Sequence, residues 1–103
     1  MYDSVSTPYT LDEVLSVFRY FFQGYEIVTG ERHPSIRREQ IARIVETMPY
    51  IDQNHRGSAD IEPEDYPCLI DAYFRTDFRN CNYRINHFFS GQIRELRFYE
   101  QIY

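Results

Sequence analysis

The sequence predicts a compact all-α bundle of four to five helices, and three observations support this. Apolar residues recur at spacings of three and four along most of the chain. No segment shows the sustained apolar–polar alternation over β-branched residues that a strand needs. Turn-forming residues such as Gly30, Pro49 and Ser90-Gly91 separate the periodic segments. Because 103 residues suffice for one ordinary core, we expect a single domain over residues 10–103.

The first helix is predicted over residues 11–29. Thr10 and Glu13 form a capping-box pattern at its start, and Gly30 supplies a C-terminal stop. The apolar stripe contains Leu11, Val14, Leu15, Phe18, Phe21, Phe22, Tyr25 and Val28. The preceding residues 1–9 have no apolar period, so we expect them to form a flexible N-terminal arm.

The second helix is predicted over residues 36–48, where Ile41, Ile44, Val45 and Met48 recur with helical spacing before Pro49. The third is predicted over residues 63–75, with acids in its first turn and the stripe Tyr66, Leu69, Ile70, Tyr73 and Phe74. Pro67 leaves the start of this helix open, since a later start would make Asp65 the cap.

Two shorter helices complete the predicted bundle. The first covers residues 83–89, with Ile85, Phe88 and Phe89 facing inward. The second covers residues 91–102, with Ser90 as its cap.

Composition excludes several classes of protein. A chain that is 43% hydrophobic and 17% aromatic is too apolar to be disordered. Two cysteines cannot form a disulfide-dense scaffold, and no apolar run is long enough to span a membrane. The N-terminus has no secretory-signal pattern, so we expect a cytoplasmic protein.

Much of the chain resembles small uncharacterised proteins encoded on integrative and phage-like mobile elements of Gram-positive gut bacteria. The similar segments are Tyr25-Glu26, residues 30–34, residues 64–66, residues 70–74, residues 86–94 and residues 97–100. The resemblance implies a mobile-element context, but it implies no activity and assigns no functional residue.

No catalytic motif is present, so we expect a non-enzymatic protein with no cofactor and no small-molecule substrate. The loop over residues 52–63 matches part of a calcium-binding pattern at Asp52, Asn54, Gly57 and Asp60. Arg56 and Pro63 occupy positions where that pattern needs ligand oxygens. A polar turn is therefore the favoured interpretation, and cation binding by this loop is left open.

The cysteines and histidines lack the short spacing of a zinc site, so no metal is expected. We expect Cys68 to be a small buried residue beside the third apolar stripe, and Cys81 to be partly exposed. His87 is expected to be packed and hydrogen-bonded at the edge of the core.

All 11 basic residues are arginines, and they are unevenly distributed along a chain of net charge −5. Eight of them form three clusters that are candidates for anion or nucleic-acid binding: Arg32, Arg37 and Arg38; Arg75, Arg79 and Arg84; Arg94 and Arg97. The alternative is that these arginines form ion pairs with nearby carboxylates. The net negative charge favours that alternative, because attraction of the whole molecule to phosphate is absent.

Eighteen Tyr and Phe residues exceed what one small core should need, and Tyr and Arg are enriched at interface hot spots. We therefore predict a small binding module whose exposed tyrosines contact a partner protein or a second copy. The candidate tyrosines are Tyr2, Tyr9, Tyr99 and Tyr103. Two alternatives are a nucleic-acid-associated accessory factor and an acidic inhibitor of a host DNA-binding enzyme.

Overall fold

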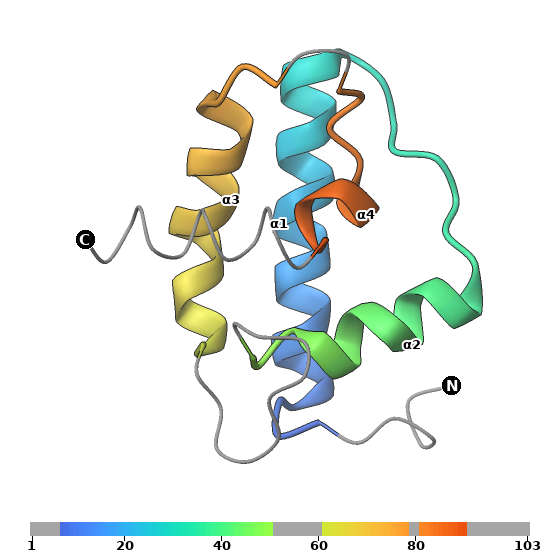
Figure 1. Ribbon diagram of the computed structural model, residues 1–103, viewed down its shortest axis with the longest axis vertical. Helices are drawn as coiled ribbons and strands as arrows, with labels where there is room; N and C mark the ends of the chain where they lie inside the picture. The colour runs from blue at the N-terminus through green and yellow to red at the C-terminus, as the bar shows by residue number, and fades with distance from the viewer. Residues whose placement is uncertain (1–6, 51–60, 79–80, 91–103) are drawn as a thin grey trace.

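The computed structural model describes residues 7–50, 61–78 and 81–90, and in these ranges it contains helices and no strand (Figure 1). The elements are α1 (Leu11–Thr29), α2 (Arg38–Thr47), the 3₁₀ turn η2 (Pro63–Asp65), α3 (Tyr66–Arg75) and α4 (Ile85–Phe88). The predicted all-α class is therefore confirmed for the described part of the chain. No helix in these ranges is long and apolar enough to cross a membrane.

α1 is the element around which the others are arranged (Figure 1). α3 lies beside it and runs in the same direction, while α2 crosses near the start of α1. The connection over residues 30–37 returns from the end of α1 to α2 on the side opposite α3.

α1 has the predicted bounds because both of its ends carry the predicted caps. The Thr10 hydroxyl accepts from Glu13 N–H at 3.2 Å, and Thr10 N–H donates to the Glu13 carboxylate at 2.8 Å. Gly30 ends the helix in the left-handed region at φ 76°, which glycine adopts without a Cβ penalty. Leu11 and Val28 were expected on the core face but are 50% and 52% exposed, so those two assignments are wrong.

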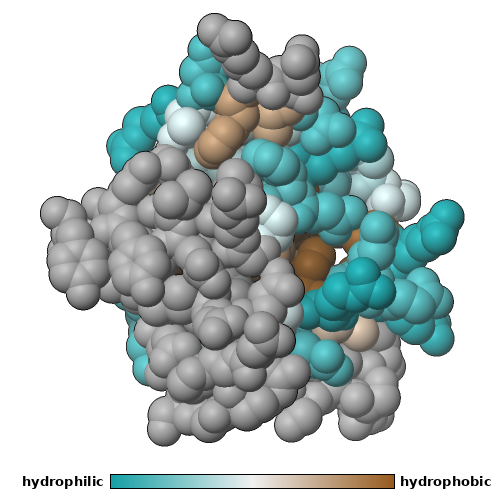
Figure 2. Space-filling view, in the orientation of Figure 1, coloured by the Kyte–Doolittle hydropathy of each residue, from teal (hydrophilic) through white to brown (hydrophobic). Residues whose placement is uncertain are grey.

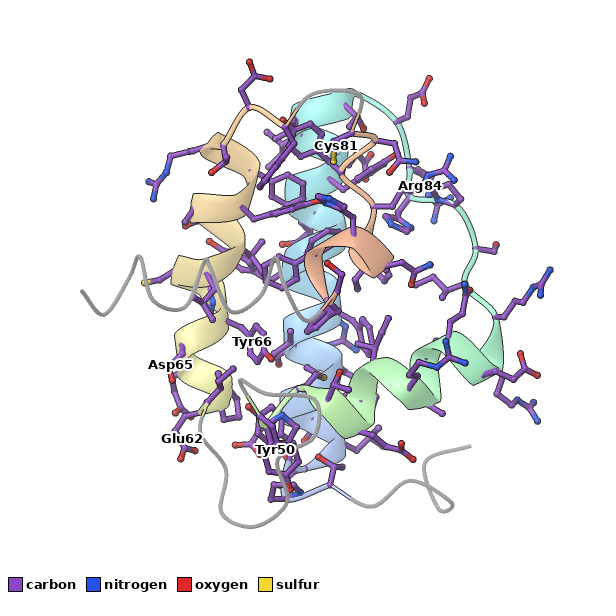
Figure 3. All side chains as sticks on the ribbon, viewed as in Figure 1. Tyr50, Glu62, Asp65, Tyr66, Cys81 and Arg84 are labelled. Carbon is purple, nitrogen blue, oxygen red and sulfur yellow. The ribbon has the colours of Figure 1, made fainter. Side chains whose placement is uncertain are left out.

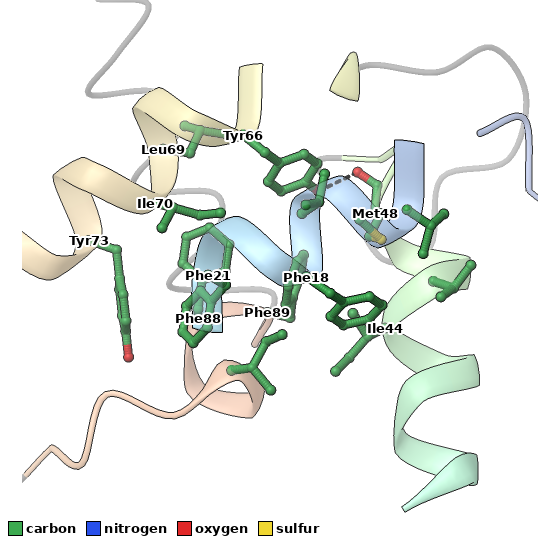
Figure 4. Packing of buried hydrophobic residues seen from close by; sticks show 14 of the residues in the cluster. Phe18, Phe21, Ile44, Met48, Tyr66, Leu69, Ile70, Tyr73, Phe88 and Phe89 are labelled. Atoms are coloured by element: carbon green, nitrogen blue, oxygen red, sulfur yellow. Dashed lines mark hydrogen bonds between the residues drawn. The ribbon is translucent and has the colours of Figure 1, made fainter. Parts of the chain in front are cut away.

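α2 begins two residues later than predicted. Residue Arg37 stays extended, and its N–H donates to the Gln40 side chain at 3.1 Å. At the other end, the Met48 carbonyl accepts from the Tyr66 hydroxyl at 2.5 Å (Figure 4). This hydrogen bond ties the C-terminal end of α2 to the start of α3.

The third predicted helix is present, with a 3₁₀ first turn. The Asp65 carboxylate accepts from Glu62 N–H at 3.0 Å and so caps η2, whereas α3 receives no side-chain cap. Pro67 then lies in the first turn of α3, where its missing N–H costs no helical hydrogen bond.

α4 is shorter than the predicted 83–89 helix. Tyr83 is in the left-handed region at φ 57° and Arg84 is extended, so the helix cannot begin before Ile85. Ile85, Phe88 and Phe89 are buried, as predicted. The predicted helix over residues 91–102 lies outside the described residues.

Tyr9 is buried, with 7% of its surface exposed, so the prediction that it lies exposed on a flexible arm is wrong. Its hydroxyl donates to the Ile61 carbonyl and lies 3.4 Å from the Met48 carbonyl. Residues at the start of the described chain are thus attached to the core, whereas residues 1–6 lie outside the described ranges.

The core is built largely from aromatic rings (Figure 4). Phe21 lies 5.4 Å from Phe88 and 4.9 Å from Phe74 between ring centroids, and Tyr73 lies 5.1 Å from Phe88. Every Tyr and Phe in the described ranges is buried or half-buried. The expected surplus of exposed tyrosines is therefore absent from this part of the chain.

Candidate functional site

A groove of about 590 Å³ lies between α1, the connection over residues 31–37 and the first turn of α2. Leu15, Phe22, Ile36 and Ile41 line it, and all four are half-buried. We call this surface the α1–α2 groove. Figure 2 shows the molecule hollowed beside α4, with hydrophobic side chains inside the hollow and hydrophilic residues around it. The groove offers apolar contact area that the core does not cover.

His33 forms one wall of the α1–α2 groove and is held on several sides. Its ring lies 4.9 Å from the Phe22 ring and 4.7 Å from the Tyr25 ring, between centroids. Its Nε2 lies 3.0 Å from Ile85 N–H and its Nδ1 lies 2.8 Å from the Pro34 carbonyl. An N–H must donate to Nε2 and a carbonyl must accept from Nδ1, so these partners assign the neutral tautomer with a proton on Nδ1.

Burial lowers the pKa of His33, and Arg84 lowers it further, while the hydrogen bond to the Pro34 carbonyl opposes both. The wall of the groove is therefore a neutral imidazole at neutral pH. The hydrogen bond from Ile85 N–H joins the 31–37 connection to the first residue of α4, whereas the bond to the Pro34 carbonyl lies within the connection.

The rim of the groove is mainly positive. Arg19 and Arg32 line it, and Glu26 is the acidic residue among the lining residues. Arg37 and Arg38 are exposed at the start of α2. None of the arginines in the described ranges forms a salt bridge with a carboxylate there, so the ion-pair alternative is not realised among these residues.

The structure rearranges the predicted arginine clusters. Arg84 lies near His33 in the 31–37 connection, where its charge lowers the pKa of His33 (Figure 3). Arg75 ends α3, which lies on the other side of α1. Arg79, Arg94 and Arg97 lie outside the described residues, as do Tyr2, Tyr99 and Tyr103.

A second cluster of reactive side chains lies where residues 81–83 and α4 meet α3. Cys81 Sγ is 3.4 Å from His87 Nδ1, and the Tyr73 hydroxyl is 2.7 Å from the same nitrogen. The prediction that His87 is packed and hydrogen-bonded is confirmed, and Cys81 is half-buried, as expected. The prediction for Cys68 is wrong: it is exposed, because α3 turns Leu69 and Ile70 toward the core instead.

Within the described ranges, no group of three or more His, Cys, Asp or Glu residues is placed to hold a metal ion. The greater part of the 52–63 loop, the candidate for cation binding, lies outside those ranges.

The apolar periods predict Leu15, Phe22 and Ile41 in the core stripes and do not include Ile36. A signal for the groove was nevertheless present in the first helix. Its apolar set includes both Phe21 and Phe22, which cannot share one narrow face because adjacent residues are about 100° apart on a helix. The second apolar face is the one that the α1–α2 groove uses.

No protein-family model, no curated protein and no solved structure matches the chain. The resemblance to mobile-element proteins therefore stays a prediction.

Proposed function

We propose that this protein is a non-enzymatic binding module whose α1–α2 groove holds an acidic amphipathic segment of a partner protein. The observation that carries the proposal is the combination of an apolar lining with arginines along the rim. A groove of this size accepts several apolar side chains, and amphipathic helices commonly bind in this way.

The charge on the rim favours an acidic occupant. Arg19 and Arg32 are exposed and have no carboxylate partner in the described ranges, so their guanidinium groups are available for bidentate contacts. A segment with apolar residues on one face and carboxylates beside them would satisfy the lining and the rim together. A basic segment would meet repulsion at the same positions.

Nucleic acid suits the groove less well. Leu15, Ile36 and Ile41 make much of the lining aliphatic, which gives bases no surface for stacking. The Phe22 and His33 rings that also line the groove pack against each other, with their centroids 4.9 Å apart. The net charge of −5 also opposes approach of a polyanion over longer distances. A short acidic peptide needs only the local positive rim.

The test uses two fluorescently labelled helical peptides that share one apolar face and carry either glutamate or lysine elsewhere. In fluorescence polarisation with the full chain, we expect saturable binding of the glutamate peptide and none of the lysine peptide. Ile36→Asp should abolish binding, because it places a charge in the apolar lining. Ile27→Asp is the matched control, since Ile27 is 83% exposed on α1 and does not line the groove.

Arg32→Glu should weaken binding of the glutamate peptide and strengthen that of the lysine peptide. Several outcomes would overturn the proposal. One is equal loss of binding in the Ile27 and Ile36 variants, and another is binding of neither peptide. Steeply salt-dependent binding of a labelled DNA or RNA oligonucleotide would point to the nucleic-acid alternative. Self-association that Ile36→Asp abolishes would make a second copy the occupant.

A further inference from the structure

Cys81 lies in a setting that differs from that of an ordinary half-buried cysteine. Its Sγ is 3.4 Å from His87 Nδ1 and 3.7 Å from the Tyr73 hydroxyl. Tyr83 N–H donates to the same sulfur at 3.2 Å. A proton acceptor and a backbone donor therefore both face this thiol, which Figure 3 places close to the end of α1.

The position of the Tyr83 donor is fixed by the fold of the surrounding loop. The Tyr83 hydroxyl donates to the Thr76 carbonyl at 2.7 Å and accepts from Phe78 N–H at 2.9 Å. These two hydrogen bonds anchor the Tyr83 side chain, and the Tyr83 backbone, in the left-handed region, donates its N–H to Cys81.

Tyr73 connects the thiol and the imidazole without acting as a base. Burial raises the pKa of Tyr73 far above its usual value, and the hydrogen bond to Cys81 adds to that shift. Its hydroxyl therefore stays protonated, and it contacts both His87 Nδ1 and Cys81 Sγ. The protonated hydroxyl donates to Nδ1, so the proton passes from sulfur to the hydroxyl oxygen as the hydroxyl gives its own proton to nitrogen.

We propose that Cys81 is a nucleophilic thiol that forms a reversible mixed disulfide with small-molecule disulfides, with His87 as the proton acceptor. The Cys81 S–H proton moves to His87 Nδ1, and the thiolate attacks one sulfur of R–S–S–R. The original S–S bond breaks as the new one forms, so Cys81 is oxidised and the departing R–S⁻ is reduced. That thiolate takes up the proton and leaves as R–SH.

The thiolate is the reacting form of a cysteine, so groups that accept the proton and stabilise the anion accelerate the reaction. Tyr83 N–H supplies the stabilising donor, and the protonated imidazole supplies a second. Cys68 is the natural comparison within the same chain, because it is exposed. Accessibility alone would make Cys68 the faster thiol, whereas the proposal makes Cys81 faster.

The test measures reaction of single-thiol proteins with 2,2′-dithiodipyridine, whose thiopyridone product absorbs light. Cys68→Ser leaves Cys81, and Cys81→Ser leaves Cys68. At neutral pH we expect Cys81 to react at least about tenfold faster than Cys68. His87→Gln should slow Cys81 about tenfold and leave the rate of Cys68 unchanged. Mass spectrometry should find one thiopyridyl group on Cys81, removable by dithiothreitol.

A second measurement compares the native and the unfolded protein. Because it needs no substitution at His87, its result does not depend on whether such a variant folds. Native Cys81 should react faster than the same thiol in denaturing urea, because unfolding removes His87 and Tyr83 N–H from the sulfur. The proposal is overturned if native Cys81 reacts more slowly than unfolded Cys81, or no faster than Cys68. It is also overturned if a folded His87→Gln variant keeps the full rate.

Discussion

Replacing His33 with leucine tests whether this residue fastens the groove wall to α4. The variant loses the acceptor for Ile85 N–H and the ring contacts with Phe22 and Tyr25. A hydrogen bond of this kind contributes about 1 kcal/mol, and the aromatic contacts together contribute about 1 kcal/mol more. We therefore expect the free energy of unfolding to fall by about 2 kcal/mol, which lowers Tm by about 10 °C in a chain of this length.

The pH dependence separates this hydrogen-bonding role from simple packing. Because burial lowers the pKa of His33 in the folded state below its usual value of 6.5, the unfolded chain takes up this proton first as pH falls. His33 thus stabilises the fold fully above its unfolded-state pKa, and the contribution is lost as pH falls toward the lower folded-state pKa. Protonation also places a donor on Nε2, opposite Ile85 N–H, beside the positive charge of Arg84.

The assay is urea unfolding of wild type and His33→Leu at about pH 8 and about pH 5, followed by circular dichroism. Subtracting the free energy of unfolding of the variant from that of wild type removes the contribution of every other titrating group that the substitution leaves undisturbed. Wild type should lose more stability than the variant on acidification, so the gap between them should narrow. An equal loss in both proteins would refute the assigned tautomer and the hydrogen bond on which it depends.

Two further substitutions test contacts that the sequence did not predict. Tyr9→Phe should lower the free energy of unfolding by about 1–2 kcal/mol in urea melts, because it removes the hydroxyl that donates to the buried Ile61 carbonyl; an unchanged midpoint would mean that Tyr9 is not docked. Gly24→Ala should destabilise α1 despite a better helix propensity, because the new Cβ would lie 2.9 Å from the Phe74 ring. In a Phe74→Leu background the same change should instead stabilise the protein, and destabilisation in both backgrounds would contradict this reasoning.

A helix is predicted best from the sequence when the residues that begin and end it contact only residues a few positions away. Thr10, Glu13 and Gly30 fix both ends of α1 by contacts within a few residues, so its bounds could be predicted. The start of α4 follows the left-handed conformation of Tyr83, whose side chain is hydrogen-bonded to Thr76 and Phe78 in the preceding loop. Sequence periodicity carries no information about such contacts, so the predicted helix began too early.

The predictions that Tyr9 is exposed and that Cys68 is buried were wrong for related reasons. An isolated tyrosine without apolar neighbours in period gives no sign that carbonyls near residues 48 and 61 will accept from it. Cys68 lies beside a strongly apolar stripe, but one step of about 100° around α3 is enough to turn it outward. Both outcomes depend on how the helices and loops pack together, which the pattern of apolar residues along the sequence does not determine.

Charge is the feature whose meaning changes most between the sequence and the fold. Arg75 and Arg84 belong to one cluster in the sequence, but Arg75 ends α3 on one side of α1 and Arg84 acts on His33 in the connection on the other side. A basic segment of the chain is therefore not a basic face of the molecule. Since the described arginines are exposed and unpaired with carboxylates in the same ranges, they retain their capacity to bind an external anion. Arg19 and Arg32 line the α1–α2 groove together with Leu15, Phe22, Ile36 and Ile41. Because charge and apolar area occur together there, the groove, rather than the linear clusters, is the surface to test for a partner.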